Sequence, residues 1–196
     1  MIAWINAGAL VTLTALTVVL YVLSVRPEAW SRKIGPRAYP LSGRLRNAAM
    51  ACMFLGLGTF VLYYFFPLSI TPLPQYLPWR YWISVVLGLL LAIPAGYFLV
   101  RGVTDAGEES AIPSPKTRLF GGIYRQIRHP QAWEGVAWPI LGLLLHSPFL
   151  VLYGLLWVVL ECGMIYSEEK DLILRFGKEY EEYRKKTPAF FPKLKK

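Results

Sequence analysis

Five long apolar runs determine most of what this 196-residue chain can fold into. A bilayer core about 30 Å thick is crossed by a helix of roughly 20 apolar residues. The sequence holds five runs of about that length, at 3–24, 47–69, 81–101, 131–146 and 148–166. They leave little chain for a soluble domain. We therefore expect an all-α, polytopic membrane protein, with residues 1–196 as one domain that has five transmembrane helices and the bilayer as a partner.

The basic residues predict how these helices are oriented. Three segments, 25–46, 101–130 and 167–196, hold 20 of the 21 Lys and Arg, and only Arg80 lies elsewhere. With five crossings, all three segments lie on the same side. Basic loops stay in the cytoplasm, so the sequence predicts an external N-terminus and a cytoplasmic C-terminus. This placement accounts for the net charge of +9 without nucleic acid as a partner.

The last two runs are joined by only three residues, 146–148. Such a short link predicts an antiparallel helical hairpin. The two cytoplasmic ends of this hairpin carry the basic triplet 128–130 and the acidic pair Glu168 and Glu169. Separately, the His and the acidic pair suit the ends of helices. Brought together, an Arg and a His facing two carboxylates suit a zwitterionic ligand such as an amino acid.

An amphipathic helix is predicted beyond the acidic pair. Apolar residues recur on one helical face at Leu172, Phe176, Tyr180 and Tyr183, and Pro188 ends the pattern. Such a helix can lie on an anionic leaflet, held by basic residues. It can also cover the polar site beside it, and the two interpretations do not exclude each other.

Two carboxylates fall inside the predicted hairpin helices. Glu134 and Glu161 each cost roughly 2.5–3.5 kcal/mol to place in a bilayer, so each needs a reason. One reason is snorkelling to the headgroups or pairing with an Arg such as Arg128. The other is a catalytic position in a water-filled cavity, where a carboxylate holds a cation or takes a proton. The sequence contains no metal-ligand spacing and gives no indication of an oligomeric state.

The order of the motifs resembles a known family. The run GIYRQIRHP is followed by the predicted hairpin, and then by EEKDLILRFGKEYEEYRKKTPAFFP. Over roughly residues 98–196, this pattern is similar to the isoprenylcysteine carboxyl methyltransferase and phospholipid methyltransferase superfamily. Residues 1–97, the N-terminal transmembrane helices, carry no such signature.

The resemblance implies an integral membrane methyltransferase that uses S-adenosylmethionine. In that family the methyl donor binds at the cytoplasmic end of the last two helices, and a lipid or lipidated acceptor enters from the bilayer. The donor-binding residues that the resemblance implies are Lys116, Thr117, Arg118, Leu119, Gly122, Tyr124, Arg128, His129, Pro130, Gln131, Glu168 and Glu169.

The chain departs from the family pattern at three places. Ala132 stands where a Tyr is usual, and Glu134 stands where a Gly is usual, with Gly135 one residue later. Met164 replaces the Arg with which carboxyl methyltransferases hold the acceptor carboxylate. These departures favour a lipid amine, such as a phosphatidylethanolamine headgroup, over prenylcysteine. A membrane sterol or steroid reductase that uses NADPH shares the Arg-His-Pro pattern, and a non-catalytic protein on the same scaffold is a further alternative.

Overall fold

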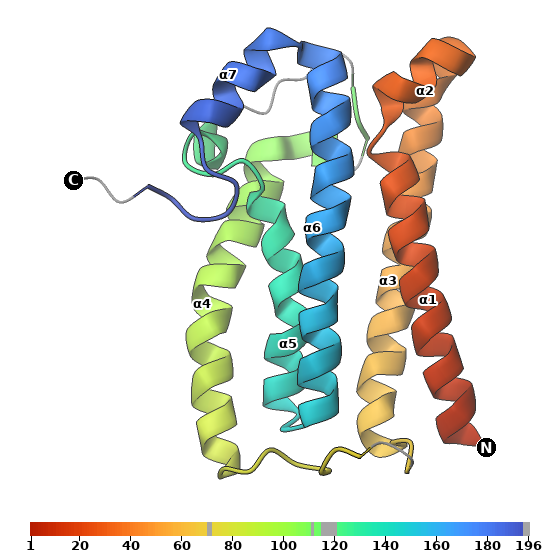
Figure 1. Cartoon of the computed structure of the whole chain (residues 1–196), viewed down its shortest axis with the longest axis vertical. Helices are drawn as coiled ribbons and strands as arrows, with labels where there is room; N and C mark the ends of the chain where they lie inside the picture. Colours follow the sequence, from red (N-terminus) through yellow and green to blue (C-terminus); the bar gives the residue numbers. More distant parts are fainter. Residues whose placement is uncertain (70–71, 111, 115–120, 194–196) are drawn as a thin grey trace.

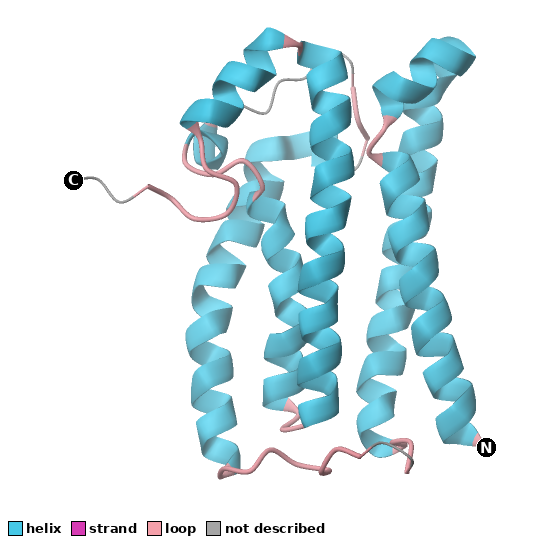
Figure 2. Cartoon of the chain, in the orientation of Figure 1, coloured by secondary structure: helices cyan, strands magenta, loops and turns pink. Residues whose placement is uncertain are grey.

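The computed structural model describes residues 1–69, 72–110, 112–114 and 121–193, and within these ranges every regular element is helical (Figure 2). The α-helices are α1 Ile2–Ser24, α2 Pro27–Ile34, α3 Ala38–Phe65, α4 Tyr81–Ala106, α5 Glu134–Leu144, α6 Pro148–Phe176 and α7 Lys178–Lys186. Short 3-10 helices are η1 Gly35–Arg37, η2 Gly107–Ser110, η3 Gly122–Arg125 and η4 Pro130–Trp133. The all-α prediction is confirmed for this part of the chain.

Four helical segments are long and apolar enough to cross a membrane: α1, the run from α2 through α3, α4, and α6. They correspond to four of the five predicted spans. The fifth, 131–146, contains the η4 turn and an α5 of only 11 residues, which is too short to qualify by length.

The helices form two groups (Figure 1), and aromatic side chains make contacts between them. Helices α1 and α3 pack against each other, and α5 packs between α4 and α6. Phe60 of α3 meets Trp138 of α5 edge-on at 5.2 Å between ring centroids, and Tyr63 of α3 stacks on Phe149 of α6 at 4.2 Å. The bundle is therefore held laterally by large apolar side chains, which require no water at the interface.

Helices α5 and α6 approach closely because small residues lie between them. A Cβ on Gly154 of α6 would lie 2.2 Å from the backbone nitrogen of Pro139, and one on Gly142 of α5 would lie 2.6 Å from the backbone of Leu150. Above this contact, the rings of Trp138 and Trp157 stack at 4.5 Å. Small residues allow such backbone approach between membrane helices.

The two ends of the bundle differ in charge. The N-terminus, the loop after α3 and the link between α5 and α6 lie at one end in Figure 1, together with the start of α4 and its Arg80. Helices α2 and α7 lie at the opposite end, with the segment around η3. The described parts of the three basic segments therefore gather at a single end of the molecule.

Several helices run past the boundaries predicted from hydropathy. Helix α3 begins at Ala38 rather than at 47, and α6 continues to Phe176 rather than ending at 166. Hydropathy marks where a helix leaves the apolar layer, but the backbone hydrogen bonds continue through charged residues. Gly177, with φ +57°, ends α6, so the predicted amphipathic face is divided between the end of α6 and a separate α7.

Candidate functional site

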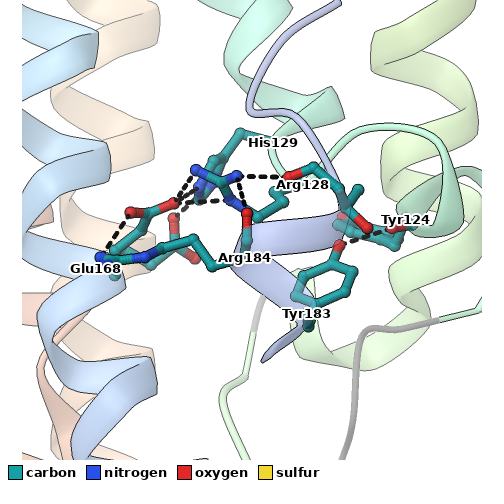
Figure 3. Close-up of polar contacts among 8 residues, drawn as sticks. Tyr124, Arg128, His129, Glu168, Tyr183 and Arg184 are labelled. Atoms are coloured by element: carbon teal, nitrogen blue, oxygen red, sulfur yellow. Dashed lines mark hydrogen bonds and ion pairs between the residues drawn. The ribbon is translucent and has the colours of Figure 1, made fainter. Parts of the chain in front are cut away.

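Glu169, near the end of α6, holds three cationic side chains, those of Arg128, His129 and Arg184, which are labelled in Figure 3. The Nε of Arg128 donates a hydrogen bond to its Oε1 at 2.9 Å, and the Nη2 of Arg128 lies 2.8 Å from the same oxygen. The Nε2 of His129 lies 3.0 Å from Oε1, and the Nη1 of Arg184 from α7 lies 3.7 Å from Oε2. The predicted meeting of the basic triplet and the acidic pair is therefore present in the structure.

His129 lies between the two carboxylates and is 7% exposed. Its Nδ1 faces the Oε2 of Glu168 at 3.6 Å, while its Nε2 faces Glu169. Burial alone would lower the pKa of this imidazole, but the hydrogen bonds and charges of Glu168 and Glu169 outweigh burial and raise the pKa to about 9. At neutral pH the ring is therefore an imidazolium that donates from both nitrogens.

The C-terminal segment fixes the backbone of this pair. The N–H of Arg128 donates to the carbonyl of Pro188 at 2.9 Å, and the N–H of His129 donates to that of Ala189 at 3.0 Å. The Nη1 of Arg128 also donates to the carbonyls of Arg184 and Thr187. Because these bonds replace water at a buried guanidinium, the segment after α7 acts as a cover over the site.

Tyr124 links the same region to α4 and α7. Its hydroxyl donates to the carbonyl of Gly102 at 3.1 Å, and Gln131 donates to the Tyr124 hydroxyl at 3.1 Å. Tyr183 of α7 donates to the Tyr124 carbonyl at 2.6 Å (Figure 3). Tyr124 thus joins α4, η4 and α7 through its hydroxyl and its backbone carbonyl, and this positions the loop before η4.

A cavity of about 250 Å³ lies beside this cluster and receives residues from α1, α3, α4, α6 and α7. Of the predicted site residues, the following line it: Tyr124, Arg128, His129, Pro130, Gln131, Glu134, Glu161 and Glu168. Glu169 does not line it, since its oxygens are turned to the cations. Lys116, Thr117, Arg118 and Leu119 lie outside the described residues.

Gly122 also stays away from the cavity, and its environment shows a different role. It has φ +53°, and a Cβ there would lie 2.2 Å from the Oδ2 of Asp105. That carboxylate accepts a hydrogen bond from the N–H of Ile123 at 2.7 Å. Gly122 therefore allows η3 to dock on the end of α4, which is a structural role.

We expect Gly122→Ala to lower stability by roughly 1–3 kcal/mol, because the new side chain meets both backbone strain and the Asp105 carboxylate. Thermal unfolding in detergent measures this. Gly121→Ala is the matched control, because its φ is −98° and no atom lies within 4 Å of the new Cβ. Equal melting temperatures for the two variants would contradict the docking role of Gly122.

A second cavity, of about 430 Å³, adjoins the first between α3, α4 and α5. Its wall is almost wholly apolar, with residues such as Leu57, Ala92 and Ile140. Three residues line both cavities: Met53, Leu99 and Glu134. Glu134 therefore stands at the junction between an apolar groove inside the helical bundle and the polar cavity.

Sequence reasoning missed the contribution of the N-terminal helices. Tyr21 of α1 lines the polar cavity, within electrostatic reach of Glu168, Glu161 and Glu134. Arg46 of α3 lines it too, and its Nη1 donates to the carbonyl of Ser110 at 3.2 Å. Tyr21 lies within an ordinary apolar run and Arg46 among other basic residues, so no local signal identifies either.

Asp171 joins the two halves of the chain next to this cavity. Its carboxylate accepts hydrogen bonds from the N–H groups of Glu28 at 3.1 Å and Ala29 at 2.8 Å, in the first turn of α2. It is 3% exposed. Helix α2 is thereby held against α6, and its Pro27 forms part of the cavity wall.

Among the residues that the structure describes, no group of three or more His, Cys, Asp or Glu side chains is arranged to hold a metal ion. The site offers instead a buried imidazolium, a carboxylate facing a cavity, guanidinium groups and several aromatic rings. Comparison of the chain with protein-family models, with curated proteins and with solved structures finds no match.

Proposed function

We propose that this chain is an integral membrane methyltransferase of the isoprenylcysteine carboxyl methyltransferase and phospholipid methyltransferase superfamily. It transfers a methyl group from S-adenosylmethionine to an acceptor that enters from the lipid phase. One observation carries the proposal: the polar cavity, lined by Glu168 and His129, adjoins an apolar groove, and Glu134 lines both. A polar donor and an apolar acceptor can meet in such a site.

The lining of the polar cavity suits the proposed donor. Glu168 provides a negative charge for its ammonium group, and Arg46 provides a positive charge for its carboxylate. Tyr180, Tyr183 and Phe176 add aromatic surface on which a purine can stack. When bound, S-adenosylmethionine supplies an electrophilic methyl group on a sulfonium sulfur.

The side chains of this protein contribute positioning and exclusion of water. Glu169 holds Arg128 and His129, which in turn hold the segment 187–189 over the site. His129 keeps Glu168 oriented towards the cavity by an ion pair. Holding two reactants in a dry, fixed geometry is the larger part of catalysis for a transfer that needs no elaborate acid or base.

The proposal includes a membrane arrangement with the α2 and α7 end in the cytoplasm and the N-terminus outside. In it, α5 and α6 form a helical hairpin, and η4 with α5 makes the fifth crossing. Four residues of 3-10 helix and 11 of α-helix span about 25 Å, close to the thickness of a bilayer core. The gathering of basic segments at one end supports this orientation.

Binding of the donor tests the function directly. We expect the purified protein in detergent to bind S-adenosylmethionine and its demethylated product, and Glu168→Gln to weaken binding at least tenfold, because a charge-assisted contact is lost. Isothermal titration calorimetry measures both affinities. The control is Glu182→Gln, which makes the same chemical change at an exposed α7 residue paired with Lys185.

Other outcomes of this experiment overturn the proposal. Thermal stabilisation by NADPH, but not by the methyl donor, would favour the reductase. A protein that binds neither compound would be a non-catalytic member of the same architecture. Equal affinities of the two Glu→Gln variants would remove Glu168 from the donor site.

A further inference from the structure

The route from the apolar groove to the polar cavity meets charged groups in a fixed order. Glu134 stands at the junction of the two cavities, and Glu161 lies beside it, since a Cβ on Gly135 would be 3.2 Å from the Cβ of Glu161. Along α6, Glu168 and Arg175 follow at successive intervals of seven residues. Each interval corresponds to about 10 Å along the helix axis. Counted from the junction, the carboxylates of Glu161 and Glu168 therefore come first, and the guanidinium group of Arg175 lies two intervals beyond Glu161.

Helix α3, on the opposite wall of the polar cavity, places its charged residue in the same order relative to the junction. Met53 lines both cavities, and Arg46 precedes it by seven residues, about 10 Å nearer to the α2 end. The charges of Glu134, Glu168 and His129 act on Glu161, and the charge of Arg46 acts on Glu168. The junction is therefore acidic, and the guanidinium groups lie in a separate layer beyond it.

Neither acidic side chain at the junction is engaged by the protein. Within the described ranges, Glu134 and Glu161 make no hydrogen bond or ion pair with another residue. A carboxylate at this depth costs roughly 2.5–3.5 kcal/mol, so an unpaired pair next to an apolar groove points to a ligand that completes it. Charge complementarity requires that this ligand be cationic or a hydrogen-bond donor.

We propose that the acceptor is a long-chain amine, a lipid whose nitrogen directly follows its hydrocarbon chain. The chain occupies the groove between α3, α4 and α5, and the nitrogen lies between Glu134 and Glu161. This inference rests on the proposed methyl transfer and names its acceptor. Glu134 and Glu161 are then specificity-determining residues that contact the substrate.

A phospholipid headgroup suits this order poorly. Its phosphate lies between the acyl chains and the amine, so the phosphate would stand beside the two carboxylates, about 10 Å short of the level of Arg46. The phosphate and the two carboxylates are all negatively charged, so they would repel one another in a medium of low dielectric. A lipid carboxylate is excluded by the same argument, and the next cavity-lining residue along α6, Met164, supplies no cation.

The atoms and charges of the proposed methyl transfer balance when Glu134 and Glu161 are the proton acceptors. The neutral amine nitrogen forms a bond to the methyl carbon, while the carbon–sulfur bond of the donor breaks and its electron pair stays on sulfur as a thioether. The methylated nitrogen is then an ammonium, and one of its protons passes to the carboxylate of Glu161 or Glu134. An amine that arrives protonated gives its first proton to the same pair.

The test compares three acceptors that share an 18-carbon chain: octadecylamine, distearoylphosphatidylethanolamine and octadecanoic acid. The protein is reconstituted in phosphatidylcholine vesicles with a donor that carries a tritiated methyl group. We expect at least tenfold more label in the amine than in either of the others. Equal or greater labelling of the phospholipid or the acid would overturn the acceptor assignment.

A binding measurement gives a readout independent of turnover. Octadecyltrimethylammonium cannot accept a methyl group, and its binding is followed by tryptophan fluorescence, since Trp133 and Trp138 line the groove. We expect Glu134→Gln with Glu161→Gln to weaken its binding at least tenfold and to leave the binding of octadecanol unchanged. Unchanged binding of the cation would overturn the role of the pair.

Binding of the donor shows whether the proposed methyl transfer fails or only the assignment of the acceptor fails. If the wild-type protein does not bind S-adenosylmethionine and labels none of the acceptors, the proposed methyl transfer fails. If the donor binds and label goes to the phospholipid or the acid, only the long-chain amine fails. Glu182→Gln, at a residue that lines neither cavity, controls for the loss of a carboxylate in general.

Discussion

Gly154→Ala is expected to separate α5 from α6 and to destabilise the folded protein strongly. The new Cβ would lie 2.2 Å from the nitrogen and 2.5 Å from the Cα of Pro139. Both are backbone atoms, so no side-chain rotation relieves the overlap and one helix must shift. We expect a cost at or above the upper end of the roughly 1–3 kcal/mol that overpacking usually takes.

The measurement is thermal unfolding in detergent, followed by tryptophan fluorescence. A loss of about 3 kcal/mol corresponds to a melting temperature lower by roughly 6–12 °C in a chain of this size. The Trp138–Trp157 stack lies directly beside the overlap, so its fluorescence should change even in the folded variant.

Gly163→Ala is the matched control for this substitution. It lies in the same helix, and a Cβ there meets nothing within 4 Å. Because Ala is a better helix former than Gly by about 1 kcal/mol, the control should be neutral or slightly stabilising. A Gly154→Ala protein that melts within about 2 °C of Gly163→Ala would contradict the close approach of α5 and α6.

Hydropathy located four of the membrane segments because burial in lipid depends on composition alone. It did not locate their ends. Helix α3 starts nine residues before the predicted 47, passing through Arg44 and Arg46, since a helix that leaves the apolar layer still satisfies its own backbone. The same holds for α6 beyond Glu168, until Gly177 adopts a positive φ.

The polar cluster was predictable because a short link between two helical runs predicts that their far ends lie side by side, and α5 and α6 do pack against each other. The different roles of the two acidic residues within this cluster could not be predicted. Glu168 and Glu169 are adjacent and chemically identical in sequence, yet Glu169 holds Arg128, His129 and Arg184, while Glu168 lines the cavity. Neighbours on a helix point about 100° apart, and only the packed structure shows which one faces the cavity.

Residues from the N-terminal helices could not be predicted for a different reason. Tyr21 and Arg46 reach the cavity because α1 and α3 pack beside α6, and no local pattern specifies that contact. Motifs in 98–196 describe one wall of the site. The opposite wall depends on tertiary packing between helices that lie far apart in the sequence.

The stability of the folded protein is expected to fall as the pH rises from about 6.5 to about 9, because of His129. The imidazole has a pKa near 6.5 when exposed, and Glu168 and Glu169 raise it to about 9 in the folded state despite its burial. Below pH 6.5 both states are protonated and the stabilisation is complete. Between the two values only the folded state holds the proton, so stability declines by about 1.4 kcal/mol per pH unit.

The whole effect is on the order of 3 kcal/mol, and above pH 9 it is lost. His129→Gln keeps an amide donor but does not titrate, so melting temperatures of the wild type and the variant isolate the contribution of the ring. The groups that face this ring are Glu168 and Glu169 on α6, with Arg128 beside it in the chain and Arg184 on α7 reaching it through Glu169.

The wild type should be more stable than His129→Gln at pH 6, and the two should converge near pH 9. The same titration should weaken donor binding, because a neutral ring no longer donates from both nitrogens and releases one of the two carboxylates. A constant difference between the melting temperatures of the two proteins from pH 6 to 9 would mean that folding does not raise the pKa of His129, so that the ring is neutral above about pH 6.5. The cluster would then be held by Arg128 and Arg184 alone, and Glu168 would lose the ion pair that orients it towards the cavity.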